Sequence, residues 1–283
     1  MKIFVDAIYY LCLAGIVYLC LRVFGVASFK IPSESMSPSL TTGDNVLVFK
    51  PAMGARLFNL FATLRGEQVA VYRTPGIRKL RRNDVVVFNF PHPHDWDTIE
   101  MHIMKYYIKR CIGLPGDTVS IRSGFFEIRG VNIPLGNVDA QRRISMREKG
   151  AFGEGIFNAF PFDSIVGWNI RDFGPLYIPR KGDEAPMNRT NYLLYRKAIE
   201  WEQKAPLEYR DSVVYLAGKP VESYTFGKNY YFVAGDRTED SQDSRYWGLL
   251  PEEYIVGKAW LIWKSTDPYS GKFKWERFLK KIN

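Results

Sequence analysis

Cysteine is scarce in this sequence of 283 residues. Two of its three cysteines, Cys12 and Cys20, lie in an apolar N-terminal stretch, which leaves Cys111 alone in the rest of the chain. One cysteine cannot form an internal bridge, so a disulfide framework is excluded whichever compartment the domain occupies. Internal repeats and low-complexity tracts are absent as well. With 46% hydrophobic and 15% aromatic residues, the composition is that of a folded chain.

Histidine is equally scarce, and its placement argues against two kinds of site. His92 and His94 flank Pro93, and His102 follows nearby. Pro93 disturbs the strand geometry that would bring the first two together, and no cysteine or acidic residue stands at ligand spacing. We therefore expect surface-loop histidines, with neither a bound metal nor a Ser-His-Asp triad. No cofactor is expected.

Acidic residues are fewer than basic ones, which gives a net charge of +9. Such a charge suits nucleic acid, an anionic membrane or acidic partners. The sequence has no zinc-finger spacing and no basic region leading into heptads, so no nucleic-acid partner is expected.

One long apolar run is present, at the N-terminus. Ala7 to Leu21 carries no charge, and after Arg22 the run continues through Phe29. At about 1.5 Å per residue it spans roughly 34 Å as a helix, enough to cross a hydrocarbon core. A cleaved signal peptide is the alternative, but its apolar core would be shorter and a small-x-small site would follow. We expect an uncleaved anchor that spans the lipid bilayer. The distribution of charge does not predict which end faces the cytoplasm, because both flanks of the helix are basic.

The rest of the chain predicts a mainly β fold. Short β-branched or alternating blocks end at turns rich in Gly, Asp and Pro. Between Ser120 and Lys228 the pattern weakens around one helix candidate, Asn191 to Gln203, behind a Thr190 cap, which indicates an inserted α+β subdomain. The strands are expected at Asn45–Phe49, Asp84–Phe90, Tyr107–Ile112 and Tyr230–Ala234.

Two segments could supply a serine nucleophile and its base. The first, PSESMSPSL from Pro32, holds two serines two residues apart between prolines that restrict the backbone. The second, from Tyr107 to Asp117, places Lys109 within an apolar strand. A lysine there normally faces solvent. If it faces inward, burial lowers its pKa and the neutral amine can accept a proton.

These segments resemble bacterial type I signal peptidase (leader peptidase). The family pattern has a Pro-Ser-x-Ser-Met block after a transmembrane helix, a Gly-Asp turn with a strand, a Tyr-x-Lys-Arg block ending in Pro-Gly-Asp, and a Gly-Asp block ending in Arg-x-Trp-Gly. All four blocks occur here in that order, between Pro32 and Gly248: PSESMSPSL, TTGDNVLV, YIKRCIGLPGD and GDRTEDSQDSRYWG.

The resemblance implies a Ser-Lys dyad protease on an antiparallel β catalytic domain with one transmembrane helix. Ser35 aligns with the nucleophile and Lys109 with the general base. Ser33 aligns with the hydroxyl that completes the oxyanion hole with the Ser35 N–H, and Ser241 with the serine that orients the lysine. Supporting positions match Asp236, Asp243, Arg245 and Arg110.

The resemblance also implies a substrate and a location. Ile31, Pro32, Tyr107 and Ile108 fall where the family lines pockets for small residues at −1 and −3 of a preprotein's signal peptide. The substrate would add as a strand between these segments. The enzyme would be a single-pass protein of the bacterial cytoplasmic membrane, with its catalytic domain on the extracytoplasmic side.

One block departs from the pattern. Where the family has Asn-Arg-Asp-Asn, this chain reads Arg237-Thr238-Glu239-Asp240. Either Arg237 replaces the family arginine or that arginine is missing. The departure favours one alternative, a catalytically weak or silent membrane-anchored paralogue that binds exported chains. Self-cleaving SOS repressors share a Ser-Lys dyad on a related β fold, but they carry no transmembrane segment.

Two further elements are amphipathic and suit either an anionic membrane or the β core. The first is residues 56–65, with Leu57, Leu60, Phe61 and Leu64 on one helical face. The second is the C-terminal tail, with its aromatic residues among lysines.

The expected organisation has five parts. They are an anchor (1–29), the first part of the catalytic β domain (30–119), the inserted subdomain (120–228), the return segment of the catalytic domain (229–265) and a basic amphipathic tail (266–283).

Overall fold

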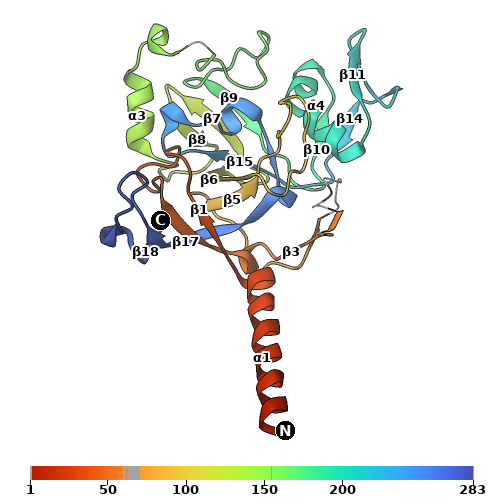
Figure 1. The fold of residues 1–283 in the computed structure, drawn as a ribbon. Helices are drawn as coiled ribbons and strands as arrows, with labels where there is room; N and C mark the ends of the chain where they lie inside the picture. The colour runs from red at the N-terminus through yellow and green to blue at the C-terminus, as the bar shows by residue number, and fades with distance from the viewer. Residues whose placement is uncertain (1, 60, 63–64, 66–70, 154, 283) are drawn as a thin grey trace. The chain divides into compact units, whose positions relative to one another are not determined.

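The computed structural model of the chain describes residues 2–59, 61–62, 65, 71–153 and 155–282 (Figure 1). The chain divides into two compact units, and the nucleophile segment belongs to a different unit from the strand that leads into it. The first unit comprises Met1–Pro32, Thr42–Leu80 and Val256–Asn283, and the second comprises Ser33–Thr41 and Arg81–Ile255.

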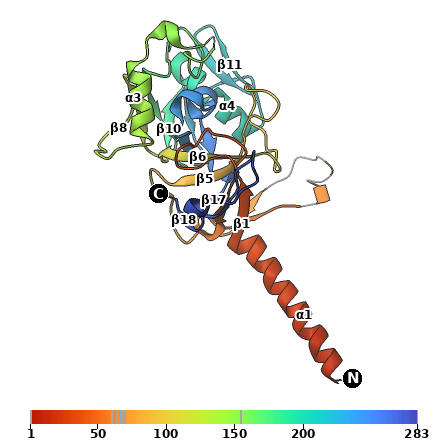
Figure 2. The same ribbon diagram turned by 60° about the vertical axis from the view of Figure 1, so that its left-hand side comes forward.

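A long apolar helix begins the first unit. Helix α1 spans Lys2–Cys20 and a π-helical turn continues it over Leu21–Gly25; Figures 1 and 2 show it extending away from the strands of its unit. The 23 residues Ile3–Gly25 are long and apolar enough to cross a membrane. The predicted anchor is therefore too long at its C-terminal end. Val26–Lys30 forms strand β1, because these residues pair with β2.

The rest of the first unit is an antiparallel sheet in the order β1, β2, β17, β18. Strand β2, Asp44–Phe49, alternates buried and half-buried residues, and its Val46 and Val48 pair with Ile262 and Ala259 of β17. Strand β17 spans Ile255–Ser265. A short hairpin, β3 (Arg56–Leu57) with β4 (Tyr72–Arg73), completes the described strands of this unit.

Both amphipathic elements predicted for the first unit differ in the structure. Leu57 lies in strand β3, Phe61 is exposed, and Leu60 and Leu64 lie outside the described residues. The tail forms a 3₁₀ turn, Trp275–Arg277, and strand β18, Lys280–Lys281, which pairs with β17. An edge of β17 that accepts main-chain hydrogen bonds favours an extended tail there.

The second unit contains the strand that carries the predicted base, Lys109. Strands β5 (Val85–Asn89), β6 (Tyr106–Gly113), β15 (Tyr230–Ala234) and β16 (Leu250–Pro251) pair in that order, each antiparallel to the next. Every residue of β5 and β15 is buried, which explains their continuous apolar sequence. The four strands predicted from the sequence are confirmed by β2, β5, β6 and β15.

The stretch 120–228 shares a hydrophobic core with strands β6 and β15. Ile112 of β6, Phe232 of β15 and Leu194 of the helix α4 belong to one buried cluster. Its elements are β7 (Thr118–Arg122), β8 (Phe125–Ile128), α3 (Val138–Met146), β9 (Phe173–Tyr177), β10 (Glu184–Pro186), α4 (Arg189–Gln203), β11 (Leu207–Arg210), β12 (Val213–Leu216), β13 (Lys219–Pro220) and β14 (Ser223–Thr225).

Helix α4 confirms the helix candidate but begins earlier. Its N-cap is Asn188, whose side chain accepts a hydrogen bond from the N–H of Asn191, so Thr190 lies inside the first turn. Leu194, Tyr195, Ala198 and Ile199 form the buried face.

Candidate functional site

The predicted nucleophile lies on a tightly turned segment of the second unit. Within Ser33–Thr41, the N–H of Ser37 donates to Glu34 O at 2.9 Å and the N–H of Leu40 donates to Met36 O at 2.9 Å. Met36 and Leu40 are fully buried, whereas Ser35 is half-buried. The two large apolar side chains hold the segment in place, while Ser35 between them and the surface is only partly covered.

Ser35 meets the predicted base directly. The Nζ atom of Lys109 lies 2.5 Å from Ser35 Oγ. Lys109 is on β6, opposite Val86 of the fully buried strand β5, and only 4% of it is exposed. The sequence separates these two residues by 74 positions, so the contact comes from the tertiary fold.

Burial lowers the pKa of this lysine. Desolvation lowers the pKa of Lys109 from its ordinary value of 10.5 to about 8, although the carboxylate of Asp243 opposes this shift. The positive charge of Arg245 adds to the lowering, and the carboxylates of Asp236 and Asp240 oppose it. A usable fraction of the amine is therefore neutral near pH 7.5, as a general base requires.

Asp243 and Arg245 form a buried pair beside this lysine. Arg245 donates from Nε to Asp243 Oδ1 at 2.8 Å and from Nη2 to Oδ2 at 2.9 Å, and neither side chain is exposed. Burial raises the pKa of Asp243, but the charge and hydrogen bonds of Arg245 outweigh it and leave that pKa below its usual value. Asp243 Oδ2 also accepts from the N–H of Gly235, so the pair fixes the turn after β15.

Arg110 and Asp236 form a second buried pair. Arg110 donates from Nε and Nη2 to the two carboxylate oxygens of Asp236 at 2.7 and 2.6 Å. It also donates to Ser39 Oγ at 3.1 Å and to the carbonyl oxygen of Asn83 at 2.8 Å. This fork ties β6, the turn after β15 and the nucleophile segment together.

Gly235 has a role that its sequence context does not reveal. A Cβ on Gly235 would lie 2.2 Å from Ser241 Oγ and 2.6 Å from the carbonyl oxygen of Ser35. The position therefore accepts only glycine without a shift of the backbone. The signal was present in the Gly-Asp turn, but a turn motif alone does not reveal what its glycine contacts.

Ser241 and Ser33 lie in different surroundings. Ser241 is buried beside Gly235, and its Oγ has no hydrogen-bond partner among the described residues. Ser33 is exposed. The lysine-orienting role of Ser241 and the oxyanion role of Ser33 thus remain expectations from the resemblance.

The four residues expected to contact substrate fall in both units. Ile31, which is buried, and Pro32, which is exposed, belong to the first unit. Tyr107 and Ile108 are half-buried on β6 in the second unit. The Tyr107 ring stacks on Phe90 with the ring centroids 4.5 Å apart, which fixes its orientation.

The side chain of Arg237, in the altered run, does not join either of the two buried ion pairs described above. That side chain is 42% exposed and its Nε lies 3.6 Å from Asp240 Oδ2, while the main-chain N–H of Arg237 donates to the carbonyl oxygen of Ser35 at 3.0 Å. Thr238 is buried, and its carbonyl oxygen accepts from Arg245 Nη2 at 2.8 Å. Glu239 pairs with Arg143 of α3. The main chain of the run, more than its side chains, supports the site.

The expectation that the histidines lie on the surface is wrong for His92. His92 is buried against Phe90 and Trp247, and its Nδ1 lies 2.7 Å from Thr98 O. Burial lowers its pKa to about 4, which makes it a neutral core residue at ordinary pH. His94 and His102 are exposed, as expected. The described part of the chain contains no group of three or more His, Cys, Asp or Glu residues arranged to hold a metal ion.

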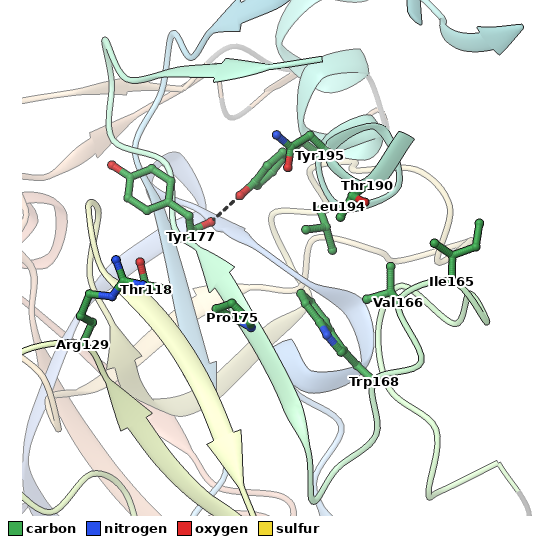
Figure 3. Close-up of a pocket in the computed structure, with 11 residues that line it drawn as sticks. Thr118, Arg129, Ile165, Val166, Trp168, Pro175, Tyr177, Thr190, Leu194 and Tyr195 are labelled. Atoms are coloured by element: carbon green, nitrogen blue, oxygen red, sulfur yellow. Dashed lines mark hydrogen bonds between the residues drawn. The ribbon is translucent and has the colours of Figure 1, made fainter. Parts of the chain in front are cut away.

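A cavity of about 430 Å³ lies in the second unit, between β9, α4 and the loop around Trp168 (Figure 3). Tyr195 donates a hydrogen bond to Tyr177 O along its wall at 3.0 Å. The lining residues include none of those predicted to take part in catalysis.

Comparison with known proteins identifies the family to which this chain belongs. The family model described as "Signal peptidase, peptidase S26" matches residues 4–264. Signal peptidase I of Pseudomonas aeruginosa is 30% identical over 265 residues, covering 89% of this chain and 70% of that protein. Signal peptidase I of Buchnera aphidicola subsp. Baizongia pistaciae is 27% identical over 266 residues, covering 91% and 76%. The crystal structure of a signal peptidase I from Enterococcus faecalis V583 is similar at 21% identity with a TM-score of 0.31, over 65% of this chain and 98% of that one.

Proposed function

We propose a Ser-Lys peptidase mechanism for this chain, which belongs to the signal peptidase, peptidase S26, family. In this proposal Ser35 is the nucleophile and Lys109 the general base that together remove signal peptides from exported preproteins. The observation that supports it most directly is the 2.5 Å contact between a buried lysine amine and a half-buried serine hydroxyl. An exposed lysine at that distance would be almost wholly protonated and could not accept the proton.

The chemistry follows from this contact. Neutral Lys109 accepts the proton of Ser35 as its Oγ attacks the scissile carbonyl carbon. The N–H of Ser35 and the hydroxyl of Ser33 would stabilise the oxyanion. Protonated Lys109 then gives its proton to the departing amine, which leaves an acyl-enzyme ester on Ser35. Lys109 next deprotonates a water molecule, which attacks the ester carbonyl. The signal peptide then leaves with a new carboxyl group, and Lys109 returns the proton to Ser35 Oγ.

The buried charges around the dyad favour this cycle. Lys109 becomes positively charged once in each half of the reaction, and a buried cation is costly without nearby negative charge. Asp243 and Asp236 supply that negative charge, while their pairing with Arg245 and Arg110 limits how far they raise the pKa of the free amine. The lysine can therefore alternate between its two protonation states.

The substrate and the membrane topology are part of the proposal. The resemblance assigns Ile31, Pro32, Tyr107 and Ile108 to the apolar pockets that would take the small side chains at −1 and −3. The apolar helix over Ile3–Gly25 would anchor the enzyme once in the bacterial cytoplasmic membrane. The catalytic domain would lie on the extracytoplasmic side, where exported chains emerge.

The test uses detergent-solubilised protein and a preprotein that carries Ala-x-Ala before its cleavage site. Ser35→Ala and Lys109→Ala should each abolish cleavage and keep the fold, because attack or proton transfer is lost. His102→Ala, a change at an exposed residue, should stay within about threefold of the unmodified rate. Sequencing of the new N-terminus identifies the bond that is cut. Wild-type turnover in Lys109→Ala would contradict the assignment.

A second candidate function rests on the altered run Arg237-Thr238-Glu239-Asp240. A silent paralogue would bind exported chains at the same surface without cutting them. The same assay separates the two, because such a protein would retain the preprotein and release no new N-terminus.

A further inference from the structure

The C-terminal segment of the first unit carries a buried ion pair far from the dyad in sequence. Arg277 donates from Nε to Asp44 Oδ1 at 2.8 Å and from Nη2 to Oδ2 at 2.6 Å. Asp44 is fully buried and 11% of the Arg277 side chain is exposed. Two parallel hydrogen bonds fix the orientation of both groups, which a single-point lysine contact would not do.

The same segment contacts the residue before Asp44. The N–H of Thr266 donates to Gly43 O at 3.1 Å. Gly43 has a φ of +94°, and a Cβ there would lie 1.9 Å from Thr266 O, so the two stretches of main chain touch directly. A bridge between Thr266 and Phe273 turns the chain back toward Arg277. Main-chain and side-chain contacts therefore fix one turn together.

This turn closes the segment that carries the nucleophile. The N–H of Gly43 donates to Ile31 O at 3.0 Å, and the N–H of Ile31 donates to Asp44 O at 2.8 Å. Residues 32–42 thus leave and return at one hydrogen-bonded stem, with Ser35 between. Fixing the ends of a loop reduces the number of conformations open to it.

We infer that the C-terminal segment 266–282 is a clasp on this stem, with Arg277 as a positioning residue for Ser35. This rests on the proposed role of Ser35 as nucleophile. A nucleophile on a loop must be held to a fraction of an ångström, and a misplacement of about 1 Å can cost roughly 100-fold in rate. The C-terminal segment would thus fix the position of Ser35 relative to Lys109, and the main chain from Asp44 back to Ser35 would transmit the effect.

Conservative changes in the full-length protein test the clasp. Arg277→Lys keeps the charge but loses the fork, and Asp44→Asn keeps the shape but loses the charge. Each should lower kcat on a short soluble peptide by about 10- to 100-fold and leave KM within about twofold, since alignment and not binding is disturbed. The matched control, Lys280→Ala with Lys281→Ala, removes two exposed positive charges from the same segment and should leave kcat within about twofold.

Hydrogen exchange supplies a readout that is independent of turnover. The amides of Ser37 and Leu40 are hydrogen-bonded within the nucleophile segment, so loss of the clasp should speed their exchange by at least about 10-fold. The control should leave them unchanged.

The proposal requires both effects. A wild-type kcat in both variants overturns it, and so does a lower kcat with unchanged exchange at Ser37 and Leu40, because the effect would then not pass through the segment. If one variant unfolds, the other carries the comparison. Full activity of Ser35→Ala would instead refute the proposed function, and the exchange measurement would still show whether Arg277 orders residues 33–41.

Discussion

The main-chain N–H of Arg237 donates a 3.0 Å hydrogen bond to the carbonyl oxygen of Ser35. The residue at which the sequence departs from the family pattern therefore contacts the proposed nucleophile through an atom that every residue except proline possesses. Its guanidinium pairs with Asp240 near the surface. The departure in side chains thus leaves this support of the nucleophile intact.

A pair of substitutions at this position separates main chain from side chain. Arg237→Ala should keep activity within about threefold, because an exposed ion pair contributes little. Arg237→Pro, at a φ of −86° that proline nearly tolerates, removes the donor to Ser35 and should lower kcat by 10-fold or more. Steady-state kinetics on a peptide substrate measure both. Equal rates in the two variants would show that this hydrogen bond does not position the nucleophile.

The pH dependence of cleavage should follow Lys109. Since its neutral form is the proposed base, kcat/KM should rise about 10-fold per pH unit below pH 8 and level off above the lysine pKa of about 8. Asp240→Asn removes a carboxylate that raises this pKa, so the midpoint should move to lower pH, by a few tenths of a unit because Asp240 is 69% exposed and screened. A midpoint that stays at 10 or above would rule out a buried, neutral lysine.

The same lysine should make stability depend on pH. Below pH 8 it is protonated in both states, and the folded state bears the full cost of the buried charge. Between about 8 and 10.5 the unfolded state binds the extra proton, so stability should rise with pH. Lys109→Met should remove this slope and stabilise the inactive protein at pH 7 by up to about 3 kcal/mol. Urea unfolding at several pH values measures it, and an unchanged slope in the methionine variant would contradict the assignment.

Gly235 should be intolerant of any side chain. Gly235→Ala places a methyl group 2.2 Å from Ser241 Oγ and 2.6 Å from Ser35 O, so the side chain of Ser241 or the main chain of Ser35 must shift. We expect at least about a 100-fold loss of kcat and a destabilisation of about 1–3 kcal/mol. Gly150→Ala is the matched control, because a Cβ there meets nothing within 4 Å. Peptide cleavage and thermal melting of both variants decide the matter, and equal behaviour would refute the close packing.

The first unit should bind anionic membranes without its anchor. Trp275 and Phe61 are each 74% exposed, and Trp260, Trp263 and Phe278 are partly exposed in the same unit, which also carries many lysines and arginines. Protein that starts at Gly25 keeps β1 and should bind anionic vesicles at low salt, with release as salt rises.

Trp275→Ser with Phe278→Ser should weaken that binding several-fold, whereas Phe162→Ser, in the other unit, should not. Vesicle sedimentation measures the bound fraction. If the anchorless protein ignores anionic vesicles, the basic charge is an ordinary solvated surface.

The sequence by itself determined the features that repeat along a short stretch of chain. Uninterrupted apolar residues specify the helix over Ile3–Gly25, and alternating or β-branched blocks specify β2, β5, β6 and β15. The motifs also picked out Ser35 and Lys109, because their residue order resembles that of a known family. Each of these signals lies within a few residues or within one recognisable block.

Only the tertiary structure decided what those residues meet. The pKa of Lys109 depends on burial and on the carboxylates that follow β15. The alternation of residues along a strand does not predict which face of that strand is buried. The approach of Gly235 to Ser35, the burial of His92, and the pairing of Arg277 with Asp44 across 233 positions likewise arise from packing between distant segments. Local propensity specifies the strands, but side-chain contacts between them follow from how the strands pair and bury their faces.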